Sequence, residues 1–216
     1  MNCIFNNGGL RPSRALPYEL HVHASGDTAG LSLGLRFLNS GRAAAVFHVY
    51  DRKHLDRLPR RYTVEPGKHL EDSWDASESS GLYDLWILGP NGFHRHFTGD
   101  LSASGRTSSP DPELRIGYEP TGLTLRVNNA GAAAASFKIT PNAYFAAAAL
   151  QGSVAAQGCA TERWSLRDSA RWYDFTLTIA ELPGYSRRFA GRVENGKDSW
   201  SDPAQGGEAI GDQLKV

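Results

Sequence analysis

Apolar and polar residues alternate along most of the chain in short runs, a pattern typical of β-strands. In the first half, "YELHVHAS", "GLSLGLRFL" and "LYDLWIL" alternate, and "AAVFHVYD" is a mostly apolar run. In "LYDLWIL", Tyr83, Leu85 and Ile87 share one face of the expected strand, and the residues between them share the other. Turn signals separate the runs at intervals of about 8 to 12 residues. The pattern therefore predicts an all-β fold.

The chain also repeats itself. A shift of 90 residues places "LRFLNSGRAAAVFHV" (35–49) over "LRVNNAGAAAASFKI" (125–139). After a two-residue insertion, "GFHRHFTG" (92–99) matches "GYSRRFAG" (184–191), so the copies share the pattern G-[FY]-x-R-x-F-x-G. One module has been duplicated. Seven short strands in each copy predict two tandem immunoglobulin-like antiparallel β-sandwich modules.

Composition marks the expected boundaries. The stretch "SASGRTSSPDP" is rich in Ser, Gly and Pro and has no apolar period, so it separates the copies. We expect module 1 at 15–103, a linker at 104–110 and module 2 at 111–203. The polar ends, 1–14 and 204–216, are expected to be loose tails. The start is interpreted as a fragment boundary with no signal peptide, so an upstream partner domain is expected.

The stretch "LGPNGFHRHFTGD" (88–100) is predicted to be the last hairpin of module 1. Pro90 suits the second position of a type I turn and Asn91 the third, and Gly92 tolerates a positive φ after them. This arrangement places a bulge at the glycine between two antiparallel strands. The second copy has "ELPGYSRRFAG" (181–191) here, so its hairpin tip is expected to differ in shape.

The repeated arginines, Arg95 and Arg187, stand on an otherwise aromatic face of the outgoing strand, which is unusual for a solvated charge. Either the stem packs while the guanidinium reaches a carboxylate or backbone carbonyls at the sheet edge, or the arginines bind a ligand. The aromatic positions around them are expected to pack in the two cores: Phe93, Phe97, Tyr185 and Phe189.

Two further local features recur or stand out. "GLYDL" places Tyr83 at the start of the penultimate strand of module 1, which is typical of a tyrosine corner whose hydroxyl bonds to nearby backbone, and Tyr173 takes this place in module 2. The Ala-rich segment 143–158 has helical propensity, but its position in the repeat corresponds to strand and connection. We interpret it as an edge region.

The histidines could suggest a metal site. The pairs His21/His23 and His94/His96 have a spacing that puts both rings on one side of a strand, where they could ligate zinc or copper. No third ligand is evident, and the second copy has other residues there, so surface histidines are the simpler interpretation. The acidic stretch 71–79 lacks the ligand pattern of a calcium loop and is interpreted as a solvated turn. No cofactor or metal is expected.

Composition excludes several functions. With 23 basic and 23 acidic residues there is no net field to attract polyanions, so nucleic-acid binding is not expected. No apolar run approaches the roughly 18 residues of a membrane span. Cys3 and Cys159 suggest no disulfide framework. No H-E-x-x-H helix and no Gly-rich phosphate loop occurs, and nothing in the sequence assembles a nucleophile with a base, so no catalytic residue is assigned.

The segments "RPSRALPYELHV", "YDLWILGPNGFHRHFTG", "YDFTLTIAELPGYSRRFAG" and "VENGKDSWSDPA" resemble the duplicated C-terminal domain of bacterial phosphocholine-preferring phospholipases C, over about 11–204. The resemblance implies a separate N-terminal phosphatase-like domain that cleaves phosphatidylcholine or sphingomyelin to diglyceride or ceramide and phosphocholine. It also implies an exported protein, secreted or periplasmic. On this interpretation the present chain is not an enzyme by itself.

Three functions follow as alternatives. The modules dock on the catalytic domain and stabilise it, or they bind a phosphatidylcholine surface or caged choline headgroup through aromatic side chains, or they form a carbohydrate or protein adhesion module. The structural role is favoured because fold-encoding residues explain most of the repeated positions. The candidate lipid, choline or docking residues are Trp74, Trp86, Phe93, Arg95, Trp164, Tyr185 and Arg187.

Overall fold

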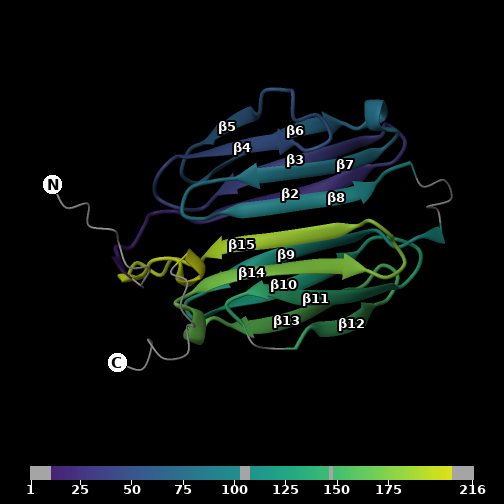
Figure 1. Ribbon diagram of the computed structural model, residues 1–216. Helices are drawn as coiled ribbons and strands as arrows, with labels where there is room; N and C mark the ends of the chain where they lie inside the picture. The colour runs from purple at the N-terminus through teal and green to yellow at the C-terminus, as the bar shows by residue number, and fades with distance from the viewer. Residues whose placement is uncertain (1–10, 103–107, 146–147, 206–216) are drawn as a thin grey trace.

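The computed structural model describes residues 11–102, 108–145 and 148–205, which form two β-sandwiches joined edge to edge, with module 1 above module 2 in Figure 1. The strands of module 1 are β2 (Leu20–Asp27), β3 (Ser32–Asn39), β4 (Ala45–Asp51), β5 (Arg60–Val64), β6 (Lys68–Asp75), β7 (Leu82–Leu88) and β8 (His94–Asp100). Those of module 2 are β9 (Pro112–Glu119), β10 (Gly122–Asn129), β11 (Ala135–Ala143), β12 (Leu150–Val154), β13 (Cys159–Ser165), β14 (Trp172–Ile179) and β15 (Ser186–Arg192). Short 3-10 turns are η1 (Ser77–Ser79), η3 (Arg167–Ser169) and η4 (Pro203–Gln205).

Each module packs a three-stranded sheet on a four-stranded one, and all neighbouring strands are antiparallel. The order is β2-β3-β6 over β5-β4-β7-β8 in module 1, and β9-β10-β13 over β12-β11-β14-β15 in module 2. The alternation seen in the sequence fills the space between the sheets, with Phe37 and Phe47 completely buried in module 1 and Leu125 and Phe175 in module 2. The predicted all-β sandwich fold is confirmed.

The two four-stranded sheets join into one. Strand β8 pairs with β15, giving an eight-stranded sheet that runs through both modules. His96 lies opposite Arg188, its own counterpart in the repeat, and Arg95 lies opposite Phe189 as Phe97 lies opposite Arg187. The ladder is therefore pseudo-symmetric: the same surface of each module contacts its copy, as in an isologous dimer interface.

The described part of the expected N-terminal tail is ordered against module 2. Strand β1 (Pro12–Ser13) pairs with β16 (Ser199–Trp200), and the backbone N–H of Ala15 donates to Asp198 Oδ1 at 3.1 Å. The expectation of a loose tail is wrong for residues 11–14, because both strands satisfy their backbone groups on each other. Residues 1–10, 103–107 and 206–216 lie outside the described residues, and they include most of the expected linker at 104–110 and most of the expected C-terminal tail.

Two local predictions met different outcomes. In the hairpin tip, Asn91 and Gly92 both have positive φ, 59° and 69°, and Phe93 N–H donates to Pro90 O at 3.2 Å. The central residues are therefore Asn91 and Gly92, as in a type I′ turn, and the predicted type I turn with Pro90 in second position is wrong. An Asn-Gly pair favours the type I′ turn because the backbone twist of this turn matches the twist of the flanking strands.

The Ala-rich segment supplies the edge strand β12, as predicted.

Candidate functional site

The guanidinium of Arg95 crosses from module 1 into module 2. Its Nη1 donates to Ala190 O at 2.9 Å and to His94 O at 2.8 Å, and its Nη2 donates to Tyr118 and Tyr173 hydroxyls, each at 3.1 Å. The side chain is completely buried. The acceptors are carbonyl and phenol oxygens, so this arginine joins the modules and is not presented to solvent.

Arg187 makes the reciprocal crossing. Its Nη1 donates to Thr98 O of module 1 at 2.7 Å and to Ser186 O at 2.9 Å, and its Nη2 donates to the Tyr83 hydroxyl at 2.6 Å. Both repeat tyrosines thus receive an arginine from the opposite module. The predicted bond from the tyrosine hydroxyl to nearby backbone does not hold these rings in place. The hydroxyl of each tyrosine instead accepts a hydrogen bond from the arginine of the other module.

Aromatic rings cover both guanidinium planes. The Cζ of Arg95 lies 4.0 Å from the centroid of Phe93 and 4.6 Å from that of Phe189, and Arg187 lies 4.0 Å from Tyr185 and 5.2 Å from Phe97. Each cation is therefore held between one ring of its own module and one ring of the other. Cation–π attraction of this kind strengthens when water is excluded, to about 2 kcal/mol or more.

Neither Arg95 nor Arg187 forms an ion pair with a carboxylate of the described residues. Removing such a charge from water costs several kcal/mol, so it is tolerated only where hydrogen bonds replace the lost hydration. Of the two structural explanations offered by the sequence, the backbone carbonyls are correct and the carboxylate is not. The phenol hydroxyls are an addition that the sequence did not indicate.

The last glycine of the repeated motif serves this junction. A Cβ on Gly99 would lie 2.2 Å from the Tyr83 hydroxyl, and one on Gly191 would lie 2.9 Å from the Tyr173 hydroxyl. Any larger residue would push the tyrosine away from its arginine. In the motif G-[FY]-x-R-x-F-x-G, the first glycine belongs to the turn and the two aromatic residues flank the arginine that crosses to the other module. The last glycine leaves space for the tyrosine of its own module.

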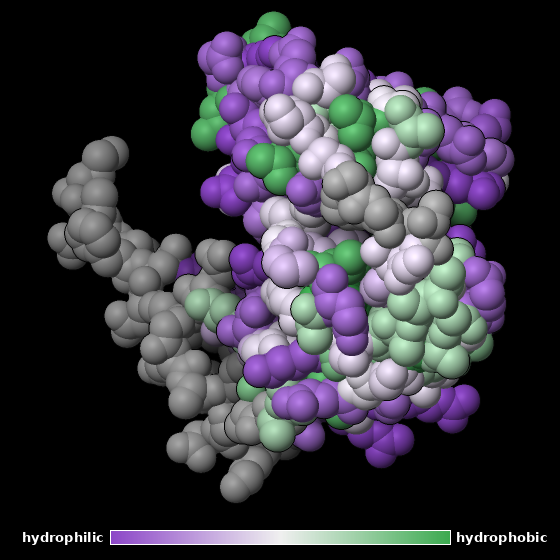
Figure 2. Space-filling model, turned by 90° about the vertical axis from the view of Figure 1, so that its right-hand side faces the viewer, coloured by the Kyte–Doolittle hydropathy of each residue, from purple (hydrophilic) through white to green (hydrophobic). Residues whose placement is uncertain are grey.

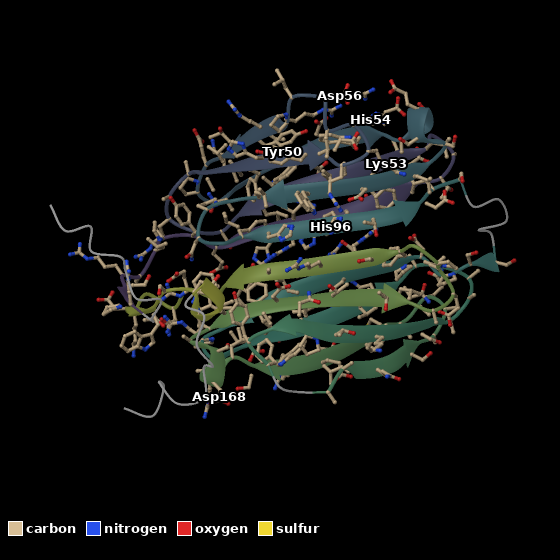
Figure 3. The ribbon with its side chains drawn as sticks, viewed as in Figure 1. Tyr50, Lys53, His54, Asp56, His96 and Asp168 are labelled. Carbon is tan, nitrogen blue, oxygen red and sulfur yellow. The ribbon has the colours of Figure 1, made fainter. Side chains whose placement is uncertain are left out.

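The opposite face of the same sheet carries a second repeated pair. His96 Nε2 lies 2.6 Å from Asp84 Oδ1 in module 1, and Arg188 makes two bonds of 2.9 and 2.6 Å to Asp174 in module 2. Figure 3 places His96 on β8 beside module 2. Because His96 and Arg188 lie opposite each other in the β8–β15 ladder, these two polar pairs are neighbours across the junction.

The three-stranded sheets also meet, at the edges of β2 and β9. The Tyr118 hydroxyl donates to Leu20 O at 2.8 Å, and the ring of His21 stacks on Tyr118 with centroids 4.7 Å apart. Burial, the Arg95 charge and His23 lower the pKa of His21 to about 4. Burial and Arg188 likewise lower the pKa of His94 to about 4. These histidines are neutral packing groups at neutral pH.

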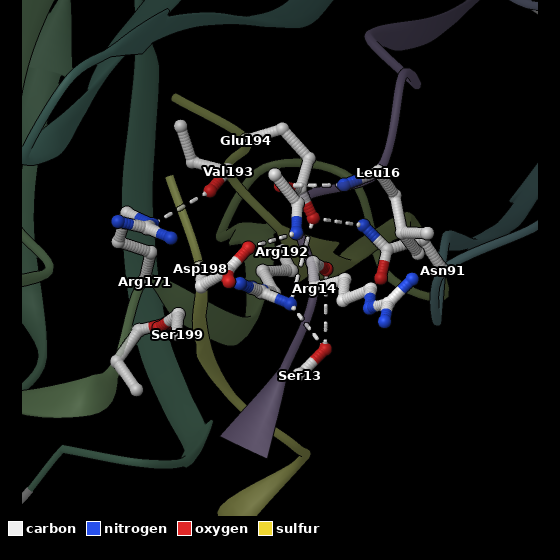
Figure 4. A network of polar contacts seen from close by, with 12 residues as sticks. Ser13, Arg14, Leu16, Asn91, Arg171, Arg192, Val193, Glu194, Asp198 and Ser199 are labelled. Carbon is white, nitrogen blue, oxygen red and sulfur yellow. Dashed lines mark hydrogen bonds and ion pairs between the residues drawn. The ribbon is translucent and has the colours of Figure 1, made fainter. Parts of the chain in front are cut away.

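A polar network closes the junction where three distant segments meet (Figure 4). Glu194 accepts a bond from Asn91 Nδ2 at 2.8 Å and from the backbone N–H of Leu16 at 3.3 Å. Arg192 donates to Ser13 Oγ at 3.1 Å and lies 3.6 Å from Glu194. The network ties the N-terminal segment and the module 1 hairpin tip to the end of module 2.

The tryptophans proposed as lipid or docking residues lie in different places. Trp74 and Trp164 are buried in the two cores, each 8% exposed, and Arg60 covers Trp74 with its Cζ 4.1 Å from the ring centroid. Trp86 is half-buried on the open face of the eight-stranded sheet, with Arg52 4.4 Å above it. The structure thus brings together only the junction residues among the candidates: Phe93, Arg95, Tyr185 and Arg187.

The acidic stretch 71–79, interpreted from the sequence as a solvated turn, forms the end of strand β6 and the turn η1. Within residues 11–102, 108–145 and 148–205, no group of three His, Cys, Asp or Glu side chains lies close enough to hold a metal ion. In the acidic stretch, Asp72 pairs with Arg60 at 3.0 Å and Glu78 pairs with Arg57. Across the same described segments, no helix is long and apolar enough to cross a membrane.

Two surfaces that the sequence did not single out are apolar. A groove of about 530 Å³ lies over β4 and β7, lined by Tyr18, Ala44, Ala45, Val46, His48, Tyr50, Leu88, Gly89 and Pro90. Val46 is 40% exposed and Leu88 is 38% exposed on its walls. The second is a shallow area on module 2 (pale green in the lower half of Figure 2), where alanines of the β10–β11 and β12–β13 loops are exposed: Ala130, Ala132, Ala134, Ala155 and Ala156.

Comparison with known proteins places the chain. The family model described as "Bacterial phospholipase C, C-terminal domain" matches residues 12–100 and 112–192. The chain is 41% identical to a non-haemolytic phospholipase C of Pseudomonas aeruginosa, over 92% of its length, and 42% identical to one of Burkholderia pseudomallei, over 90%. A haemolytic phospholipase C of P. aeruginosa is 35% identical over 90% of the chain. The chain spans 29%, 28% and 30% of these three relatives.

Proposed function

The chain belongs to the bacterial phospholipase C C-terminal domain family, and on this premise we propose that it is a non-catalytic accessory region that docks on the catalytic part of such an enzyme and stabilises it. The parent reaction would be hydrolysis of phosphatidylcholine or sphingomyelin to diglyceride or ceramide and phosphocholine. The parent protein would be exported from the bacterial cell, as the family resemblance implies.

The rigid junction supports this role. Buried arginines, rings and a continuous sheet join the modules, so the pair presents its outer surfaces in one fixed arrangement. A docking element needs such a fixed surface, because ordering two flexible modules on contact would reduce the affinity. Arg95 and Arg187, which were candidates for ligand binding in the sequence, instead hold the two modules in this arrangement.

The apolar groove over β4 and β7 is the observation that carries the docking proposal. Its walls expose Val46 and Leu88 beside the rings of Tyr18 and Tyr50, a mixture typical of protein interface cores. The relatives are more than three times as long as the matched part, and the matched part is their C-terminal domain. We therefore assign the groove to a segment of the preceding catalytic part.

The test uses the full-length enzyme with glutamates in the groove. Val46→Glu/Leu88→Glu should lower its Tm and its activity on phosphatidylcholine vesicles, because two charges replace apolar contacts. Leu88→Glu alone has a matched control in Leu82→Glu: Leu82 lies on the same strand and the same face as Leu88 and is 41% exposed, but it is outside the groove. Full stability and activity of the catalytic part expressed without this region would overturn the proposal.

A choline cage built from the predicted aromatic residues receives no support from their positions. Phe93 and Tyr185 already enclose the guanidinium groups of Arg95 and Arg187, and Trp74 and Trp164 lie inside the cores. A headgroup would have to displace core side chains to reach them. Trp86 keeps one accessible edge, but Arg52 lies over its ring.

A further inference from the structure

The connection between β4 and β5 exposes two leucines on module 1. Leu58 is 92% exposed and Leu55 is 70% exposed, whereas no other large apolar side chain of the described residues is more than 41% exposed. Their segment, "RKHLDRLP" (52–59), is the loop that we call the leucine loop. Single exposed leucines are common, but two neighbouring ones at this exposure indicate a contact with an apolar phase.

The leucine loop is held in place by its own bonds. The N–H of Lys53 donates to Asp51 Oδ1 at 2.9 Å, and the N–H of Arg57 donates to His54 O at 3.0 Å. The His54 ring lies 3.1 Å from Ser79 Oγ, and Arg57 pairs with Glu78, so the loop is anchored to η1. The exposure of the leucines is therefore a property of a formed structure.

Charge around the leucine loop is nearly balanced. Arg52 lies 3.4 Å from Asp84, Arg60 lies 3.0 Å from Asp72, and Arg57 pairs with Glu78. Lys53 and Arg61 are exposed cations that form no ion pair with a described residue. This region has little attraction for strongly anionic surfaces, but Lys53 in the loop and Arg61 just after it are available to phosphate groups.

We propose that the leucine loop inserts Leu55 and Leu58 into the interfacial layer of a phosphatidylcholine bilayer, with Lys53 and Arg61 reaching lipid phosphates. The choice of lipid rests on the proposed function. A protein partner fits less well, because two convex leucines supply far less than the roughly 800 Å² per partner of a stable interface. Figure 3 places Asp56, between the leucines, at the edge of module 1 away from module 2, so module 2 does not obstruct a bilayer there.

The test is sedimentation of this 216-residue chain with vesicles of pure phosphatidylcholine. Wild-type protein should co-sediment, and Leu55→Glu/Leu58→Glu should partition about a hundredfold more weakly or worse, because both apolar side chains that enter the bilayer are replaced by charged ones. Leu82→Glu/Leu88→Glu is the matched control, because it adds the same charge and removes two exposed leucines outside the loop. It should partition like wild type.

No binding of the wild-type chain at high lipid, or equal losses in the two variants, would overturn the proposal. Because all four replaced leucines are exposed, both variants of this chain should keep the wild-type Tm, which shows that a loss of binding is not caused by unfolding. A lower Tm of the full-length enzyme with Leu55→Glu/Leu58→Glu would show that the loop contacts protein, and would also overturn it. Failure of the docking proposal would leave vesicle binding by this chain unchanged, so the two outcomes are distinguishable.

Discussion

The guanidinium of Arg187 donates a 2.6 Å hydrogen bond to the hydroxyl of Tyr83, 104 residues earlier and in the other module. Arg95 makes the equivalent bond to Tyr173 at 3.1 Å. Each module therefore supplies a hydrogen-bond donor to a buried tyrosine at the edge of the other module's core. Both copies carry an arginine on this aromatic face because the guanidinium of each module donates a hydrogen bond to the tyrosine hydroxyl of the other module.

We expect Tyr83→Phe to lower the free energy of unfolding by about 1 to 3 kcal/mol, because it leaves the buried Arg187 short of one acceptor without changing the packed ring. Urea unfolding followed by far-ultraviolet circular dichroism measures the change. Tyr50→Phe is the control, since the Tyr50 hydroxyl forms no hydrogen bond with a described residue. A loss for Tyr83→Phe no larger than that of the control would contradict the importance of the bond.

We expect Gly99→Ala to destabilise the chain by about 1 to 3 kcal/mol, because the added methyl group would overlap the Tyr83 hydroxyl. Gly117→Ala on β9 is the matched control, since its Cβ would meet Thr124 at an ordinary 3.7 Å. Neither glycine has a positive φ, so the comparison isolates the steric overlap. Thermal unfolding of the two variants gives the answer, and similar Tm values would contradict it.

Much of the fold was predictable because alternation and repetition are local or self-similar signals. The faces of Tyr83 and Arg95 followed from period-2 patterning. The hydrogen-bond partners of Tyr83 and Arg95 could not be predicted in this way. They depend on the pairing of β8 with β15, and strand periodicity does not show which strands of different modules pair. The exposure of the leucine loop was not predictable for another reason: Leu55 and Leu58 stand between charged residues, and such a short run does not show whether a leucine is buried or exposed.

Acidification should weaken the junction. The pKa of His21 and that of His94 are lowered from 6.5 to about 4, so the unfolded chain binds more protons than the folded one between these values. Stability is therefore fully present above pH 6.5 and is lost as the pH falls towards 4, by at most about 3 kcal/mol for each histidine. Urea unfolding between pH 7.5 and about 4.5 measures the slope. The double variant His21→Gln/His94→Gln should flatten it, whereas the exposed His69→Gln should not.

The two modules should unfold together, because the buried arginines and the eight-stranded sheet couple them. Calorimetry of the wild-type chain should show one transition whose calorimetric and van't Hoff enthalpies agree. Arg95→Met/Arg187→Met keeps much of the side-chain volume but leaves carbonyl and phenol oxygens without their charged donors, at a cost of about 1.5 to 3 kcal/mol for each bond lost.

In that double variant the coupling should fall enough for two transitions to separate, or for the van't Hoff enthalpy to drop below the calorimetric one. The matched control is Arg42→Met/Arg163→Met, which removes one exposed arginine from each module and should leave a single transition. A single, unshifted transition in the junction variant would show that the β8–β15 ladder couples the modules without the arginines, because the backbone bonds of that ladder remain intact in both variants.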